Sequence, residues 1–110
     1  MIVRARGDLD LVMSGQFDEC LTWARREYDN IIIDLSAVDF MDTSALAVIV
    51  GHWKKLVAAG GRLALAGARY RYTKALWITG LADRLPLYDT VAEAIGAGTP
   101  APPADPVRQE

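Results

Sequence analysis

The chain is poor in residues that bind metals or form disulfides. Its 110 residues contain one cysteine and one histidine, so the sequence predicts neither an internal disulfide nor a metal site. It has no apolar run of the roughly 18 residues that a membrane helix needs, and it begins Met-Ile-Val-Arg-Ala-Arg without a signal-type segment. These absences predict no membrane insertion and a cytoplasmic location.

The chain also lacks a large excess of positive or negative charge. Twelve basic residues stand against fourteen acidic ones, which gives a net charge of −2, and the basic residues are scattered along the chain. A nucleic-acid partner is therefore not expected, because such partners select a basic face.

The composition indicates one globular domain followed by a tail. Apolar residues make up 52% of the chain and charged residues 24%, which is typical of a chain that buries a core. Near Gly96 the composition changes, and residues 96–110 hold four of the five prolines without any apolar periodicity. We expect a single domain over residues 1–96 and a Pro-rich disordered tail over residues 97–110.

Short apolar runs alternate with helical periods in residues 1–96. Strands are expected at Ile2–Leu11, Ile31–Leu35, Leu63–Gly67 and Leu85–Tyr88. Helices are expected from Ser14 to Asp29-Asn30, over Asp42–Ala59, over Tyr72–Thr79 and from Thr90 onward. The alternation predicts an α/β domain in which a mostly parallel or mixed sheet of about four strands packs with about four helices.

Local patterns predict how some of these elements begin and what they bury. Ser14 is the expected N-cap of the first helix, whose buried face would consist of Phe17, Cys20, Leu21, Ala24 and Tyr28. The β-branched run Ile31–Leu35 is typical of a strand covered on both faces, and Ser36–Met41 would form the loop that follows. Pro86 favours an edge position for the last strand, and Thr90-Val91-Ala92-Glu93 matches a capping box.

The segment after the central strand is the candidate functional site, because sites in open α/β sheets lie beyond the carboxyl ends of strands. Residues 36–45 contain neither glycine nor lysine, which excludes a phosphate-binding loop. No Ser-His-acid set can be assembled, so no catalytic residues are predicted. What remains is Asp42 followed by two hydroxyl residues, Thr43 and Ser44, a pattern that is also common in simple helix caps.

The helix that follows has two contrasting faces. At 100° per residue, its buried face would consist of Leu46, Ile49, Val50, Trp53 and Val57. The opposite stripe consists of Ser44, Val48, Gly51 and Lys55. A small and partly apolar outer stripe suits close approach by another protein, which favours an interaction module over an enzyme.

Other candidate residues have unremarkable interpretations. His52 lacks other ligands at suitable spacing, so no metal or catalytic role is expected, and Cys20 is expected to be an inert core thiol. Arg69, Tyr70, Arg71 and Lys74 form a small basic patch, which is either solvated or in contact with an acidic partner surface.

The run from Ile31 to Leu46 resembles the signature of STAS domains of the anti-sigma factor antagonist family. That signature is an apolar strand, Asp-Leu, a short loop and Phe-Met/Ile-Asp-Ser-Ser/Thr-Gly-Leu, which Asp34-Leu35 and Phe40 to Leu46 match with Thr43 and Ala45 in place of the usual Ser and Gly. Further similarities are Gly7-Asp8-Leu9-Asp10, Gly60-Gly61-Arg62-Leu63, Thr79-Gly80-Leu81 and Ala92-Glu93-Ala94-Ile95. Together they extend over residues 2–96.

This resemblance implies a phosphorylation switch. In the family, an anti-sigma factor with a histidine-kinase-like ATPase fold phosphorylates the hydroxyl residue after the motif Asp, and a phosphatase reverses the modification. The unmodified antagonist binds the anti-sigma factor and the phosphorylated one releases it. By position the acceptor is Thr43, with Ser44 as second choice, and the partner-binding residues are expected to be Asp42, Ser44, Val48, Gly51 and Lys55.

We therefore expect an anti-sigma factor antagonist that has no cofactor and no catalytic activity, and that is a monomer or weak homodimer. The alternative is a STAS scaffold subunit of a lipid-transport or stress-signalling complex that is not phosphorylated. There the same helix start would dock a partner.

Overall fold

The computed structural model describes residues 1–78, 80 and 84–98. In chain order the elements are β1 (Ile2–Leu9), α1 (Leu11–Glu27), β2 (Asn30–Met41), α2 (Thr43–Ala58), β3 (Arg62–Ala66), α3 (Tyr70–Ile78), β4 (Leu87–Tyr88) and α4 (Val91–Gly98). The strands lie in the order β1-β2-β3-β4, and each neighbouring pair is parallel. The α/β fold expected from the sequence is confirmed. Of the expected tail, residues 97 and 98 belong to α4 and residues 99–110 lie outside the described residues.

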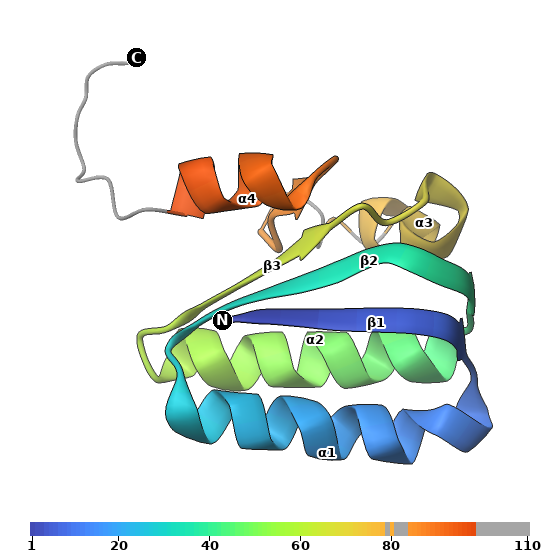
Figure 1. The fold of residues 1–110 in the computed structure, drawn as a ribbon, viewed down its shortest axis with the longest axis horizontal. Coiled ribbons are helices and arrows are strands. Elements are labelled where there is room, and N and C mark those ends of the chain that lie inside the picture. The colour runs from blue at the N-terminus through green and yellow to red at the C-terminus, as the bar shows by residue number, and fades with distance from the viewer. Residues whose placement is uncertain (79, 81–83, 99–110) are drawn as a thin grey trace.

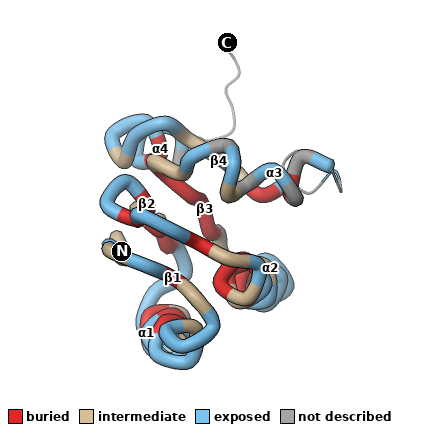
Figure 2. The backbone as a smooth tube through the Cα atoms, turned by 90° about the vertical axis from the view of Figure 1, so that its right-hand side faces the viewer, coloured by how far each residue is buried: buried red, intermediate tan, exposed pale blue. Residues whose placement is uncertain are grey.

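The helices form layers on the sheet. Figure 1 shows α1 and α2 side by side along one face, α4 on the opposite face, and α3 near the end where β2 finishes. The view along the strands in Figure 2 shows the same arrangement, with α1 below β1 and α4 above β2 and β3. The amino end of α2 and the start of α3 therefore lie at the same edge of the sheet.

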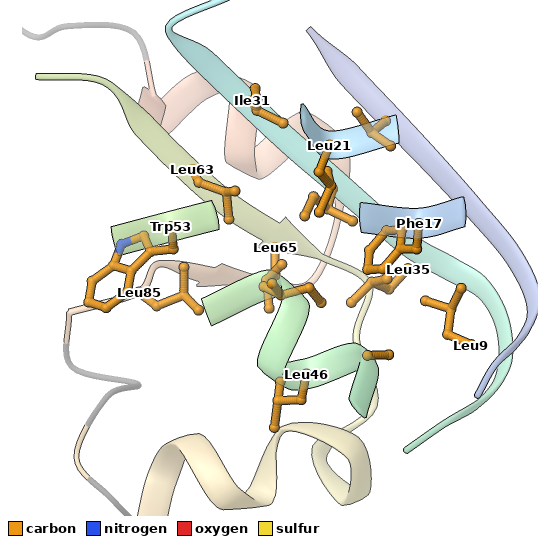
Figure 3. Close-up of a cluster of buried hydrophobic side chains, with 14 of the residues drawn as sticks. Leu9, Phe17, Leu21, Ile31, Leu35, Leu46, Trp53, Leu63, Leu65 and Leu85 are labelled. Carbon is orange, nitrogen blue, oxygen red and sulfur yellow. The ribbon is translucent and has the colours of Figure 1, made fainter. Parts of the chain in front are cut away.

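The hydrophobic core lies between the sheet and the α1–α2 layer (Figure 3). Its fully buried side chains include Leu21, Ile31, Ile33, Ile49, Leu63, Leu65, Leu76 and Leu85. Ile31–Leu35 is covered fully on the α1–α2 side and partly on the other side, where Ile32 and Asp34 are half-buried beneath α4; the next residue on that side, Ser36, is exposed. The helix on that face, α4, has eight residues and is about 12 Å long, so it is too short to cover the strand.

The first helix begins earlier than expected. Its N-cap is Asp10, not Ser14, because the Asp10 carboxylate accepts a hydrogen bond from the Met13 N–H at 3.1 Å. Ser14 lies inside the first turn and donates to the Leu11 carbonyl at 2.8 Å. The preceding strand consequently ends at Leu9 and not at residue 11.

The expected buried face of α1 is correct in its centre and wrong at its margins. Phe17, Leu21 and Ala24 are buried, whereas Cys20 and Tyr28 are exposed. Cys20 lies beside the narrow buried stripe, and Tyr28 follows the helix as its extended C-cap. Cys20 is therefore not a core thiol.

Residues 36–41 form the second half of β2 and not a loop. They pair with β1 as far as Leu9, which stands opposite Met41, and the pairing contains register shifts near Arg6 and Asp8. The sequence of residues 36–41 does not show the regular alternation that predicts a strand, because it contains polar residues and the register is irregular. Pairing with β1 nevertheless keeps this half of β2 extended.

The boundaries of α2 differ from the expected ones by one residue at each end, and Asp42 and Ala59 are its caps. Its buried face is rotated from the expected one, because Val57 is exposed and Val50 half-buried, whereas His52 and Leu56 are buried. The rotation follows from packing, since α2 contacts α1 as well as the sheet.

The last elements follow their local signals. β4 forms an edge of the sheet as expected, although it is limited to Leu87–Tyr88, and Pro86 before it accepts a hydrogen bond from the Leu65 N–H. In the capping box, the Glu93 N–H donates to the Thr90 hydroxyl, and Glu93 accepts from the Asp89 N–H. α3 begins at Tyr70, earlier than expected, and Thr79 lies outside the described residues.

Candidate functional site

Asp42 organises the start of α2 at the carboxyl end of β2. Its Oδ1 accepts hydrogen bonds from the Ser44 N–H at 2.9 Å, from the Ala45 N–H at 3.2 Å and from the Ser44 hydroxyl. Its own N–H donates to the Leu9 carbonyl at 3.1 Å, which ties the helix start to β1. The hydrogen bond from the Ser44 hydroxyl is the main reason that the pKa of Asp42 lies below its usual value, with further bonds from N–H groups acting in the same direction against desolvation.

The two adjacent hydroxyl residues have different environments. Ser44 is half-buried and its hydroxyl donates to the Asp42 carboxylate. Thr43 is the first residue of α2 and is exposed, and its hydroxyl has no hydrogen-bond partner among the described residues. The Thr43 side chain is therefore open to solvent, whereas the Ser44 hydroxyl is engaged within the cap.

Thr43 and Asp42 line a cavity of about 430 Å³ between the start of α2 and α3. The remaining lining residues are Met41, Leu46, Arg71, Tyr72, Lys74 and Ile78. Leu46 projects from the first turns of α2 toward α3 (Figure 3). The basic patch noted in the sequence thus places two of its cations, Arg71 and Lys74, at the candidate acceptor site.

Tyr72 holds α3 against the end of β2. Its hydroxyl donates to the Asp39 carbonyl, and its ring meets that of Phe40 edge to face with the ring centres 6.3 Å apart. The guanidinium of Arg71 lies over the same ring, 5.0 Å from its centre. These contacts fix one wall of the cavity.

Exposed apolar side chains surround this edge of the sheet. Leu11 and Val12 in the first turn of α1 are 73% and 84% exposed, and Ile78 at the end of α3 is 73% exposed. The Asp42 N–H donates to the carbonyl of Leu9, two residues before Leu11, which places the start of α1 beside that of α2. These residues were not predicted from the sequence, although an apolar pair directly after the N-cap Asp10, off the buried stripe of the helix, is a signal of an exposed apolar surface.

The expected partner-binding residues divide between two places. Asp42 and Ser44 lie at the helix start, whereas Val48, Gly51 and Lys55 line a separate groove between α2 and α1, together with Ser14, Gly15 and Asp18. The eleven residue steps from Ser44 to Lys55 correspond to roughly 16 Å along the helix axis. One small contact therefore cannot cover both ends of the stripe.

His52 joins α2 to α1 from inside this groove. It is 3% exposed, its Nε2 lies 2.6 Å from Oδ1 of Asp18, and its Nδ1 accepts from the Arg25 Nε–H at 3.1 Å. Nε2 therefore carries the proton in the neutral ring, because Nδ1 serves as the acceptor. Both nitrogens are engaged, and this arrangement holds two helices together.

Two structural findings bear on other classes of function. In residues 1–78, 80 and 84–98, no group of three or more His, Cys, Asp or Glu side chains is placed to hold a metal ion. No helix in this part of the chain is both long enough and apolar enough to cross a membrane.

Comparison with known proteins identifies the family. Residues 1–94 match the STAS domain. An anti-sigma F factor antagonist of Paenibacillus polymyxa is 33% identical over 99 residues, which cover 86% of this chain and 83% of the relative.

Solved structures agree with this match. An anti-sigma factor antagonist of Mycobacterium paratuberculosis has 25% identity and a TM-score of 0.76, covering 87% of this chain and 82% of its own. The Bacillus cell fate determinant SpoIIAA in its phosphorylated form has 26% identity and a TM-score of 0.71, covering 87% of each chain. The fold is thus that of a STAS domain. The chain belongs to the anti-sigma factor antagonist family, as the sequence motif predicted.

Proposed function

We propose that this protein is a cytoplasmic antagonist that binds an anti-sigma factor with kinase activity, and that phosphorylation of Thr43 ends the binding. The observation that carries the proposal is the contrast between the exposed Thr43 hydroxyl, which has no partner among the described residues, and the Ser44 hydroxyl, which is bound to Asp42. The kinship with a phosphorylated SpoIIAA supports it. The protein has no catalytic activity of its own in this proposal.

The transfer requires little from this chain beyond presentation of the acceptor. The partner's ATP provides the phosphoryl group: the bond between the γ-phosphorus and the bridging oxygen breaks, a bond forms from Oγ1 of Thr43 to phosphorus, and the hydroxyl proton is released with ADP. Asp42 caps the helix through Oδ1, so its part is to fix the backbone that carries Thr43. Activation of the hydroxyl falls to the kinase.

The added charge is compatible with the fold. A phosphate brings about −1.5 to −2 charges at pH 7, and the amino end of a helix stabilises an anion by about 0.3–1 kcal/mol. Because Thr43 is the exposed first residue of α2, no buried group must move to receive it.

The added charge acts on the binding of the anti-sigma factor. A partner that covers the helix start would have to desolvate a dianion beside the Asp42 carboxylate. A loss of about 3 kcal/mol in binding free energy corresponds to a dissociation constant more than a hundredfold higher. Phosphorylation would then release the partner while the domain stays folded.

The test uses the anti-sigma factor kinase of the same organism. With ATP, intact-mass analysis should show the addition of one phosphoryl group to the parent protein and to Ser44→Ala, and none to Thr43→Ala. Ser44→Ala is the matched control because the Ser44 and Ala45 N–H groups still bind Asp42. By calorimetry, Thr43→Ala should bind the kinase like the parent, and Thr43→Glu should bind at least tenfold more weakly. Equal binding by Thr43→Glu, or a phosphoryl group on Ser44 in the parent, would contradict the proposal.

A further inference from the structure

Two cations face the proposed acceptor from α3. Arg71 and Lys74 line the same cavity as Thr43, and both are exposed. Neither forms a salt bridge within the described part of the chain, where the ion pairs are Arg4–Asp34 and Asp18–His52. Three positions apart on a helix, the two side chains lie on one face, so both can reach the same ligand.

Arg71 is held in place before any ligand arrives. Its guanidinium stacks on the Tyr72 ring, the Tyr72 hydroxyl donates to the Asp39 carbonyl, and Phe40 packs against the same ring. The chain of contacts runs from the end of β2 to the cavity wall opposite Thr43. A planar guanidinium fixed in this way is suited to bidentate recognition of phosphate oxygens, with an ammonium group beside it as a point charge.

We infer that Arg71 and Lys74 bind the phosphoryl group of phosphorylated Thr43 within the same molecule. This inference rests on the proposed function, because it concerns the modified form of the same residue. It assigns to the basic patch a role that differs from both a solvated patch and a contact for an acidic partner. Once bound to the phosphate, the two cations would no longer be available to a docked protein.

The charges that line the cavity favour this interaction. The described lining carries two cations, Arg71 and Lys74, and one anion, Asp42, with the Tyr72 phenol as the other titratable group. Asp42 opposes a second anion, but three donors, from Ser44 and Ala45, already satisfy its Oδ1. A phosphate of about −2 charges would therefore meet a wall that is net positive.

The inference can be tested without the kinase. Phosphothreonine is incorporated at position 43 during translation of the full chain, and its second pKa is measured by a phosphorus NMR titration. A free phosphoryl group titrates near pH 6, and a cation in contact favours the dianion and lowers that value. We expect the titration midpoint of the parent to lie about one unit below that of Arg71→Gln/Lys74→Gln.

Arg69→Gln is the matched control. It removes one exposed positive charge close to α3 that does not line the cavity, so it should titrate like the parent. Each single variant should show part of the shift, which keeps the test valid even if the double variant does not fold. Equal midpoints for the parent, both single variants and the double variant would overturn the inference. A failure of the kinase to modify Thr43 would instead overturn the proposed function, because the titration does not depend on enzymatic transfer.

Discussion

Replacement of His52 by Ala tests whether the polar link between α1 and α2 is structural. The ring is 3% exposed and makes two hydrogen bonds, to Asp18 at 2.6 Å and from Arg25 at 3.1 Å. Truncation of a buried side chain of this size costs about 2 kcal/mol or more. Each hydrogen bond adds roughly 0.5–1 kcal/mol, the low end of the usual range, because Asp18 is 56% exposed and can bind water instead. We expect a loss of about 3 kcal/mol in the free energy of unfolding.

The assay is urea unfolding followed by tryptophan fluorescence, with thermal melting in parallel. For a domain of this size the loss corresponds to a melting temperature lower by roughly 10–15 °C. Lys54→Ala is the control, because Lys54 is exposed on the same helix and should change stability by no more than about 0.5 kcal/mol. In a double-mutant cycle, Asp18→Asn should cost less in the His52→Ala background than in the parent. A loss from His52→Ala as small as that from Lys54→Ala would refute the reasoning.

Two further predictions concern glycines and acid stability. Gly51→Ala should raise the free energy of unfolding by about 0.5–1 kcal/mol, because the new Cβ would meet nothing within 4 Å. Gly67→Ala should lower the free energy of unfolding by more than about 1 kcal/mol. Gly67 has a φ of +73°, and its new Cβ would lie 2.8 Å from the Cβ of Ser36. Thermal melting distinguishes the two, and destabilisation by Gly51→Ala would contradict the first. Hydrogen bonds from Ser36 and Ser44 hold the pKa values of Asp34 and Asp42 below their usual range, so the unfolded chain binds more protons in acid. The two carboxylates should contribute fully to stability above about pH 4, and this contribution should be lost as the pH falls through their folded-state pKa values. Between about pH 5 and pH 3, the free energy of unfolding in urea should fall less steeply for Asp34→Asn/Asp42→Asn than for the parent. Parallel declines would contradict the prediction.

The parts of the fold that depend on neighbouring residues were predictable from the sequence. The run Ile31–Leu35 predicts a central strand, and Asp42 followed by two hydroxyl residues predicts a helix start, because both signals act within a few residues. The capping box at Thr90 is of the same kind: the Glu93 N–H donates to the Thr90 hydroxyl, and the Glu93 side chain accepts from the N–H of Asp89, the residue before Thr90.

The parts that depend on distant partners were not predictable. Residues 36–41 are strand because β1 pairs with them, and the sequence of this segment alone resembles a loop. His52 is buried because α2 packs against α1 as well as the sheet, and Cys20 is exposed on the side of α1 that faces β1. Similarly, the sequence shows Arg71 and Lys74 as a basic patch, but only the topology places them beside Thr43.

The bond between the Ser44 hydroxyl and Asp42 has a consequence for any enzyme that modifies this helix start. Use of Ser44 as an acceptor would require that hydroxyl to leave the carboxylate, with loss of one of the donors that hold the first turn together. Discrimination between two neighbouring alcohols would thus be encoded in the substrate itself, and a kinase with loose sequence preference could still produce a single product.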